Sequence, residues 1–442
     1  MPGAHDVLRS LSRLSLVGPV ATTAIVVVGV CASIVLGALA LRSCRRALWS
    51  TGVTAALTGG VVLVSWAVSR PMPPEVAGEI AVAVFIAVTG WCLAGAAATG
   101  DRRAIRTTLT AVVAAVALSV TAVVAVNRDV ERFPTAGSLL GHGPAPGVRF
   151  VDFAEVPGPQ SRVQAGTPVE GVWRRPLRSV RDGIVTHAQI PGLRSGFAAR
   201  PALVYLPPAY LDTPRALLPV VVLVAGNPGR PDDWLGIGLA GTVSAFAAAH
   251  DGLAPVVVVP DALGADDALP LCLDSRLGNV ETYLAEDVPD WVTGHLQVNT
   301  AARAWAIGGY SYGGTCAVQL AVNRPDAYPT FLDISGQDEP SVGDHDGTVA
   351  ATFDGDEAAF AAVSARAELD AGARPDVSGV FVAGDDDVEY RPQQRRMYAA
   401  AAAAGLDVRY YDLPGAHSGQ VWGPAFAGEL GWIATRTGLL AP

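Results

Sequence analysis

The chain of 442 residues lacks lysine, so all 31 of its basic residues are arginine, set against 41 acidic residues and a net charge of −10. It has no run of basic residues that could neutralise a phosphate backbone, which argues against nucleic acid as a partner. Charged residues make up 16% of the chain, whereas proteins average about 25%. The deficit lies before residue 130, which predicts a membrane region followed by an ordinary soluble domain.

Cysteine is also scarce, with five residues in the whole chain and no Cys-x-x-Cys pair. This pattern argues against a zinc or iron–sulfur site, and the sequence implies no metal or other cofactor. Cys31, Cys44 and Cys92 lie in or beside apolar runs, whereas Cys272 and Cys316 belong to the soluble part.

Four stretches without charge are each long enough to cross a bilayer, which takes about 20 helical residues. The first is too long for a signal-peptide core, and another span follows almost at once. The sequence therefore predicts a retained membrane anchor over residues 1–130. Its four transmembrane helices are expected at about 14–41, 47–69, 80–100 and 107–127.

Arginine positions predict the orientation of this anchor. The two short loops between spans one and two and between spans three and four hold six arginines, against five spread over the other side. The positive-inside rule places these two loops in the cytoplasm, so the C-terminal domain would be extracytoplasmic. No predicted span contains a charged residue, which argues against a channel or transporter.

A Gly- and Pro-rich linker is predicted over residues 131–170, followed by a catalytic domain over 171–442. Short apolar runs in the second half alternate with segments of helical pattern, which predicts an α/β fold with a mostly parallel sheet flanked by helices. The expected strands are 201–207, 218–225, 254–260, 304–308, 330–335, 378–383 and 407–412, and the expected helices include 315–323 and 392–404.

The pentapeptide Gly309-Tyr310-Ser311-Tyr312-Gly313 follows an apolar strand and opens a helix expected to begin near Gly314. This strand–turn–helix context is that of a nucleophile elbow, in which glycines allow a sharp turn and the Ser hydroxyl stands clear. Ser311 is therefore the candidate nucleophile. A Gly-rich turn without chemistry is the alternative.

Serine needs a base, and an acid must orient that base. His417 follows the last expected strand, where this fold keeps its catalytic histidine. The acid should lie between Ser311 and His417 in the chain. The run 384–389 after an expected strand supplies Asp387, with Asp386 and Glu389 as alternatives. A calcium loop is a weak rival, because the run lacks the alternating ligand pattern.

An acyl-transfer site also requires N–H donors for the oxyanion. One is expected from Tyr312, the residue after the nucleophile. The second should follow an earlier strand, which ends here in Gly226-Asn227-Pro228-Gly229. Pro228 has no N–H, so Asn227 is the best candidate.

Residues 180–435 resemble the esterase family of α/β-hydrolases, which includes esterase D-like S-formylglutathione hydrolases, feruloyl esterases and antigen 85 mycolyltransferases. The motifs that carry the resemblance are Ser195–Arg200, Val204–Tyr210, Gly226-Asn227, Asp232–Trp234, Asp274-Ser275, Glu281–Leu284, Asp287–Trp291, Gly309–Gly314 and Gly415–His417.

The resemblance implies an α/β-hydrolase fold and selects Asp387 as the acid and Asn227 as the second donor. Ala225 stands where many relatives have His or Asp, and the membrane region departs from the soluble members. It is similar instead to exported, membrane-anchored esterase-like proteins. In an exported domain, Cys272 and Cys316 would form either a disulfide or two buried free thiols.

Three functions are compatible with these features. The first is a serine esterase that hydrolyses an envelope or lipid-linked acyl ester through an acyl-enzyme. The second is an acyltransferase of mycolyltransferase type, in which a sugar or lipid hydroxyl replaces water. The third is a membrane-displayed binding domain without activity, against which the complete Ser, Asp and His set argues.

Overall fold

The computed structural model describes residues 27–32, 34–35, 109–110, 112–121, 167–177, 179–265, 268–372 and 376–442. The chain divides into two compact units, Met1–Pro144 and Ala145–Pro442. Each unit is described here by itself.

In the first unit, residues 27–32, 34–35, 109–110 and 112–121 are helical. They fall inside the first and fourth predicted spans, 14–41 and 107–127. The spans 47–69 and 80–100 lie outside the described residues, as does most of the linker 131–170. Within the described ranges, no helix combines the length and the hydropathy that a bilayer crossing requires. The four-helix anchor stays a prediction.

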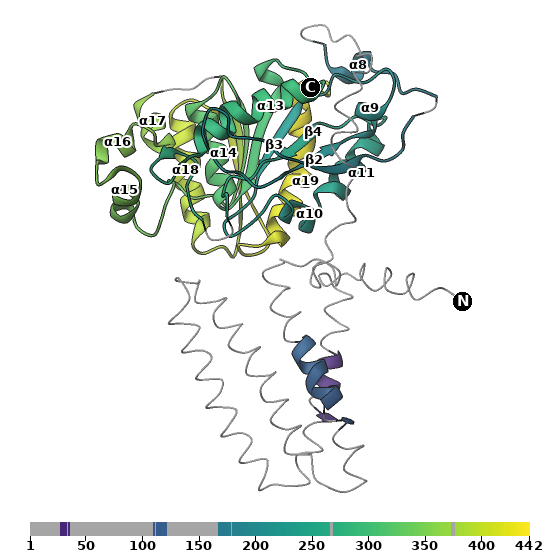
Figure 1. The fold of residues 1–442 in the computed structure, drawn as a ribbon, viewed down its shortest axis with the longest axis vertical. Helices are drawn as coiled ribbons and strands as arrows, with labels where there is room; N and C mark the ends of the chain where they lie inside the picture. The colour runs from purple at the N-terminus through teal and green to yellow at the C-terminus, as the bar shows by residue number, and fades with distance from the viewer. Residues whose placement is uncertain are drawn as a thin grey trace, which may run out of the picture. The chain divides into compact units, whose positions relative to one another are not determined.

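The second unit is built on an eight-stranded sheet in the order β1-β2-β4-β3-β7-β8-β9-β10 (Figure 1). The two neighbours β1 and β2 pair antiparallel, and β2 also runs antiparallel to β4, while every other pair is parallel. The strands are β1 (Ile184–Ala188), β2 (Ala202–Leu206), β3 (Val220–Val224), β4 (Val256–Val259), β7 (Trp305–Tyr310), β8 (Thr330–Ile334), β9 (Ser378–Gly384) and β10 (Asp407–Leu413).

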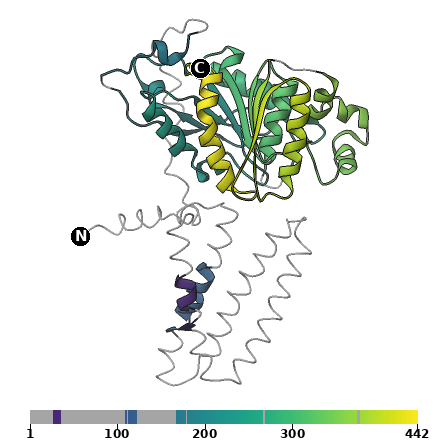
Figure 2. The ribbon, with the colours of Figure 1, turned by 180° about the vertical axis from the view of Figure 1, so that it is seen from behind.

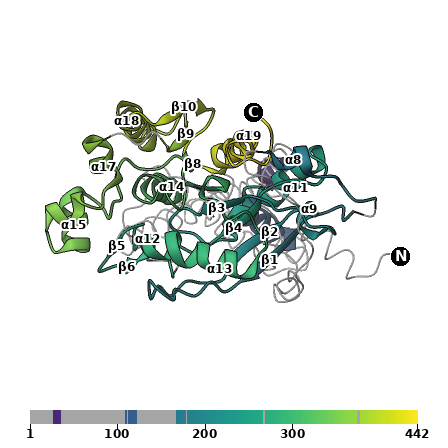
Figure 3. The same ribbon diagram turned by 90° about the horizontal axis from the view of Figure 1, so that it is seen from above.

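The period-two alternation of side chains along the strands divides the core into two layers. On β3, Val220, Val222 and Val224 pack into one buried cluster, and Val221 and Leu223 pack into the other. The first cluster includes side chains of α12 (Val280–Thr282), α13 (Val288–His295), α14 (Tyr312–Asn323), α17 (Ala365–Ala371) and α18 (Tyr390–Ala403). The second includes side chains of α10 (Asp233–Gly236), α11 (Leu239–Ala249) and α19 (Gly419–Arg436). Figure 3 shows α13 and α19 on opposite sides of β3 and β4, and Figure 2 shows α19 lying along its face of the sheet.

The helices of this unit are α8 (Val169–Val172), α9 (Pro208–Leu211), α10 (Asp233–Gly236), α11 (Leu239–Ala249), α12 (Val280–Thr282), α13 (Val288–His295), α14 (Tyr312–Asn323), α15 (His345–Phe353), α16 (Glu357–Ala361), α17 (Ala365–Ala371), α18 (Tyr390–Ala403) and α19 (Gly419–Arg436). A π-helix, η2 (Tyr283–Asp287), a 3₁₀ turn, η3 (Ala302–Ala304), and a small hairpin of β5 (Asp274–Ser275) and β6 (Gly278–Asn279) complete it.

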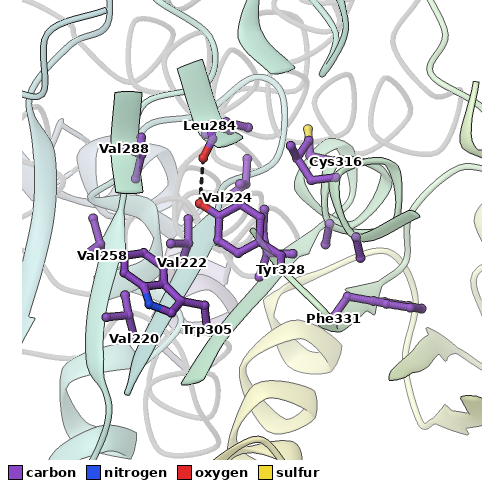
Figure 4. Packing of buried hydrophobic residues seen from close by; sticks show 14 of the residues in the cluster. Val220, Val222, Val224, Val258, Leu284, Val288, Trp305, Cys316, Tyr328 and Phe331 are labelled. Atoms are coloured by element: carbon purple, nitrogen blue, oxygen red, sulfur yellow. Dashed lines mark hydrogen bonds between the residues drawn. The ribbon is translucent and has the colours of Figure 1, made fainter. Parts of the chain in front are cut away.

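Tyr328 is fully buried in the first cluster, close to Trp305 (Figure 4). Its hydroxyl donates a hydrogen bond of 2.6 Å to the carbonyl of Leu284. A buried phenol needs such a partner because an unsatisfied hydroxyl in a core is costly. This bond joins the segment before β8 to the π-helix η2.

The seven predicted strands are confirmed, with ends shifted by a few residues at most, and so are the two predicted helices. The sheet is mostly parallel, as predicted. Strand β1 was not predicted, because its buried and exposed residues alternate only partly. The nucleophile helix begins at Tyr312 and not near Gly314, so it starts directly after the candidate nucleophile.

Candidate active site

Ser311 occupies the sharp turn between β7 and α14. Its backbone has φ 55° and ψ −124°, in the left-handed half of conformational space that side chains disfavour. The flanking glycines make this turn possible. A Cβ added at Gly309 would overlap the backbone of Gly313, and one added at Gly313 would overlap the carbonyl of Val224. The predicted steric role of both glycines is confirmed.

Backbone hydrogen bonds hold the turn in place. The Ser311 N–H donates to the carbonyl of Ile334 at the end of β8, at 2.8 Å, and the Ser311 carbonyl accepts from the N–H of Thr315 at 3.1 Å. Because α14 begins at the next residue, the Ser311 side chain lies at the positive end of that helix dipole. This position favours negative charge near the hydroxyl.

Three residues from separate loops form one hydrogen-bonded chain. The Nε2 atom of His417 lies 2.9 Å from the Oγ atom of Ser311, and its Nδ1 atom lies 2.8 Å from Oδ2 of Asp387. The three residues follow β7, β9 and β10, so they meet at the carboxyl edge of the sheet. Asp387 is 3% exposed and Ser311 8%, so the two outer members of this hydrogen-bonded chain lie largely away from water.

The acidic run after β9 divides into distinct roles. The Oδ1 atom of Asp385 accepts from the N–H of Gly415 at 2.9 Å, which fixes the loop that carries His417. Asp386 and Glu389 are exposed. Asp387 alone of these carboxylates contacts His417 in the described contacts, and its second oxygen accepts from the N–H of Tyr390 at 2.9 Å. Among the alternatives left open by the sequence, this geometry favours Asp387.

Aromatic rings surround His417 in a way that the sequence did not reveal. The ring of Tyr390 stacks on the imidazole with 3.9 Å between centroids, and Trp422 contacts it edge to face at 5.2 Å. Trp422 in turn stacks on Tyr310, the residue before Ser311, at 4.3 Å. These contacts restrict the rotation of the imidazole and exclude water from two of its sides.

The turn that follows β3 lies directly against Ser311. A Cβ added at Gly226 would stand 3.3 Å from the Cβ atom of Ser311, so the backbone of this turn approaches the nucleophile closely. The Asn227 side-chain amide donates a hydrogen bond to the carbonyl of Ala268 at 2.6 Å. The Tyr312 hydroxyl donates a hydrogen bond to the carbonyl of Ala262 at 3.2 Å. Both side chains are engaged elsewhere, so only their backbone N–H groups are candidates for the oxyanion.

Asp333 is a buried carboxyl that sequence analysis missed. It lies on β8, is 0% exposed, and accepts a hydrogen bond of 3.0 Å from the N–H of Gly336. Burial raises its pKa to about 7. Gly314 passes so close that any side chain there would overlap this carboxyl. The Asp333 carboxyl therefore packs directly against the first turn of α14. An isolated acidic residue in an expected strand was its only signal.

The other histidines of the described catalytic unit have partners away from Ser311. His187 pairs with Asp232, His345 lies between Glu339 and Glu357, and His250 and His295 pack against aromatic rings. In the described ranges, no group of three or more His, Cys, Asp or Glu side chains is arranged to hold a metal ion.

The chain is similar to known proteins in sequence and in fold. Residues 198–433 match the sequence model of a family described as "Putative esterase". A protein of Corynebacterium glutamicum, described as uncharacterized, is 37% identical over 439 residues that cover 96% of this chain and 98% of that protein.

Solved structures share the fold at low identity. A ferulic acid esterase superposes with a TM-score of 0.51 at 17% identity, covering 58% of this chain and all of that one. An S-formylglutathione hydrolase from Agrobacterium tumefaciens gives 0.49 at 19% identity, covering 59% of this chain and 98% of that one.

Replacing the acid that contacts His417 tests the assignment within the acidic run. We expect Asp387→Asn to lower kcat for an activated ester by about 10³–10⁴-fold, because the imidazole loses the partner that fixes its tautomer. The matched control is Asp386→Asn, one residue away and exposed, which should stay within about twofold of wild type. Equal losses in both variants, or none in Asp387→Asn, would contradict the assignment.

Proposed function

This chain belongs to the Esterase family of α/β-hydrolases and is a serine esterase, and on that premise we propose that Ser311, His417 and Asp387 are its catalytic triad. The single observation that carries the proposal is the unbroken hydrogen-bond chain from the Ser311 hydroxyl through both nitrogens of His417 to the Asp387 carboxylate. If His417 were an ordinary surface residue and the Ser311 turn purely structural, a hydrogen-bonded chain from serine through histidine to a buried carboxylate would not be expected.

In the first half of the proposed reaction, the Oγ atom of Ser311 attacks the acyl carbonyl while Nε2 of His417 takes the hydroxyl proton. Asp387 keeps Nδ1 protonated and stabilises the imidazolium. The backbone N–H groups of Asn227 and Tyr312 donate to the oxyanion. His417 then returns the proton to the departing alcohol, which leaves an acyl ester on Ser311.

In the second half, water enters beside the acyl-enzyme and His417 removes one of its protons. The hydroxide attacks the same carbonyl, the same two N–H groups bind the oxyanion, and the Ser311–acyl bond breaks. The proton on His417 returns to Ser311, and a carboxylic acid is released. Each cycle thus consumes one ester and one water and yields one acid and one alcohol.

A fluorophosphonate probe tests the nucleophile directly. We expect stoichiometric labelling of the folded wild type and none of Ser311→Ala, because the probe reacts only with an activated serine. Ser341→Ala is the matched control: its hydroxyl donates to the carbonyl of Gly343 on the surface, and labelling should be unchanged. Equal labelling of Ser311→Ala would contradict the assignment of the nucleophile.

Product analysis distinguishes hydrolysis from acyl transfer. With an acyl donor in water, we expect free acid and alcohol in equal amounts, with little change when glycerol or trehalose is added. The physical reason is that deacylation requires only a nucleophile that His417 can deprotonate, and water is the most abundant one. Acylated glycerol or trehalose as the main product would contradict the hydrolase and favour the acyltransferase.

We further propose that the substrate is an envelope or lipid-linked acyl ester and that the enzyme is an integral membrane protein with its catalytic domain outside the cytoplasm. The proposal is supported by the four charge-free stretches before residue 130 and by the arginines in the two short loops. The disulfide between Cys272 and Cys316 adds support, because such bonds persist mainly in oxidising compartments.

A protease site inserted at 141–147, in the linker, tests this orientation. External protease on intact cells should release a domain that still reacts with the fluorophosphonate probe, since the linker would face outward. The matched control carries the same site at 42–46, in a predicted cytoplasmic loop, and should be cleaved only after the cells are permeabilised. Protection of the linker site in intact cells would contradict the outward orientation.

A further inference from the structure

The disulfide between Cys272 and Cys316 joins the nucleophile helix to the long loop that follows β4. Cys316 lies on α14, five residues after Ser311, and its Cα atom is 5.2 Å from that of Cys272. Both residues are buried, at 1% and 2% exposed, and Figure 4 shows Cys316 facing the core from its helix. The bridge therefore fixes Cys272 of this loop to α14.

The same loop contacts the side chains of both proposed oxyanion donors. The Asn227 amide donates to the carbonyl of Ala268 at 2.6 Å, four residues before Cys272. The Tyr312 hydroxyl donates to the carbonyl of Ala262 at 3.2 Å and lies 3.5 Å from the Sγ atom of Cys272. Each donor thus has its side chain bound to the loop, while its backbone belongs to a turn that lies against or adjoins Ser311.

A buried ion pair fixes the other end of this loop to the same turn. Asp261, 1% exposed at the start of the loop, receives a bidentate pair of hydrogen bonds from the guanidinium of Arg200, at 2.7 and 2.9 Å. The same guanidinium donates to the carbonyl of Gly229 at 2.9 Å. The turn 226–229 and the loop after β4 are therefore joined at Arg200 and again at Asn227.

The geometry points to a positioning role for the Cys272–Cys316 disulfide: it holds the oxyanion donors Asn227 and Tyr312 at the distance that the reaction needs. This inference rests on the proposed function. Oxyanion donors act only when they lie about 2.7–3.1 Å from the developing charge, and losing one costs about 10²–10³-fold in kcat. Without the bridge, the loop segments that bind the Asn227 and Tyr312 side chains would be held by noncovalent contacts alone, and both donors would shift more easily. The same connection makes activity depend on the oxidation state of the pair.

Reduction of the bridge balances as a thiol–disulfide exchange. A dithiol reductant supplies two electrons and two protons, its own sulfurs form a disulfide, and the Sγ–Sγ bond becomes two thiols. The triad is untouched, because none of Ser311, His417 and Asp387 contacts the bridge in the described contacts. Reduction should therefore slow acylation and leave Ser311 able to react.

The test compares wild type with Cys272→Ala/Cys316→Ala, which removes the bridge without leaving a lone thiol. We expect kcat for an activated ester to fall about 10–100-fold with little change in KM, a partial loss of the donor contribution. The stability control is Leu439→Ala, a truncation of a fully buried core residue near the C-terminus that lowers the melting temperature and should leave kcat within twofold. Assays run well below the melting temperature of both variants.

A second measurement keeps the test informative if the double variant folds poorly. Dithiothreitol treatment of the folded wild type should lower kcat to the level of the double variant, and reoxidation should restore it, while the double variant does not respond. A folded double variant with kcat within twofold of wild type would overturn the positioning role, as would a reduced wild type at full activity. Failure of oxidised wild type to label with fluorophosphonate would overturn the proposed function itself, so the two failures are distinguishable.

Discussion

The contact between the backbones of Gly309 and Gly313 is the constraint on which the catalytic unit depends. Strand β7 and helix α14 meet there so closely that neither position can hold a side chain, and Ser311 between them is forced to a φ of 55°. Such strained backbone costs on the order of 1–3 kcal/mol and persists only where surrounding structure enforces it. The bond from the Ser311 N–H to Ile334 provides part of that enforcement. The strain places the hydroxyl at the start of a helix, within reach of a histidine from a distant loop.

Two groups of loops converge on this turn. One group contacts the Ser311 hydroxyl, and the other carries or contacts the proposed oxyanion donors. The loops after β9 and β10 bring Asp387 and His417 to the hydroxyl and are joined to each other by Asp385 and Gly415. The turn after β3 carries the proposed donor Asn227, and the proposed donor Tyr312 opens α14 directly after Ser311. The loop after β4 is joined to this region by Arg200, Asn227 and the disulfide. In the proposed mechanism, proton transfer and oxyanion binding are thus supported by separate networks. Damage to one leaves the other intact, which is why the two can be tested independently.

Local sequence patterns predicted the features that depend on interactions between residues close together in the sequence. β-Branched runs gave the strands, and Gly309 and Gly313 around Ser311 gave the elbow, because sterics restrict that turn to glycine. The residues alone left Asp386 and Glu389 as alternatives to Asp387. The choice depends on which of these carboxylates the 413–417 loop brings His417 to, and local sequence patterns do not predict the path of that loop. Tyr390 and Trp422 around His417 and the support from Asp333 arise from tertiary contacts between distant segments. The membrane anchor remains a prediction from hydropathy and arginine positions.

In the proposed mechanism, Ser311 attacks the acyl carbonyl while the N–H groups of Asn227 and Tyr312 bind the oxyanion. A crystal structure of the enzyme after reaction with an alkyl fluorophosphonate tests this arrangement, because the tetrahedral phosphorus mimics the tetrahedral intermediate of acyl transfer. We expect phosphorus bonded to Oγ of Ser311, with its phosphoryl oxygen about 2.7–3.1 Å from both backbone nitrogens. Phosphorus on another residue, or a phosphoryl oxygen turned away from both nitrogens, would show that the proposed mechanism is wrong.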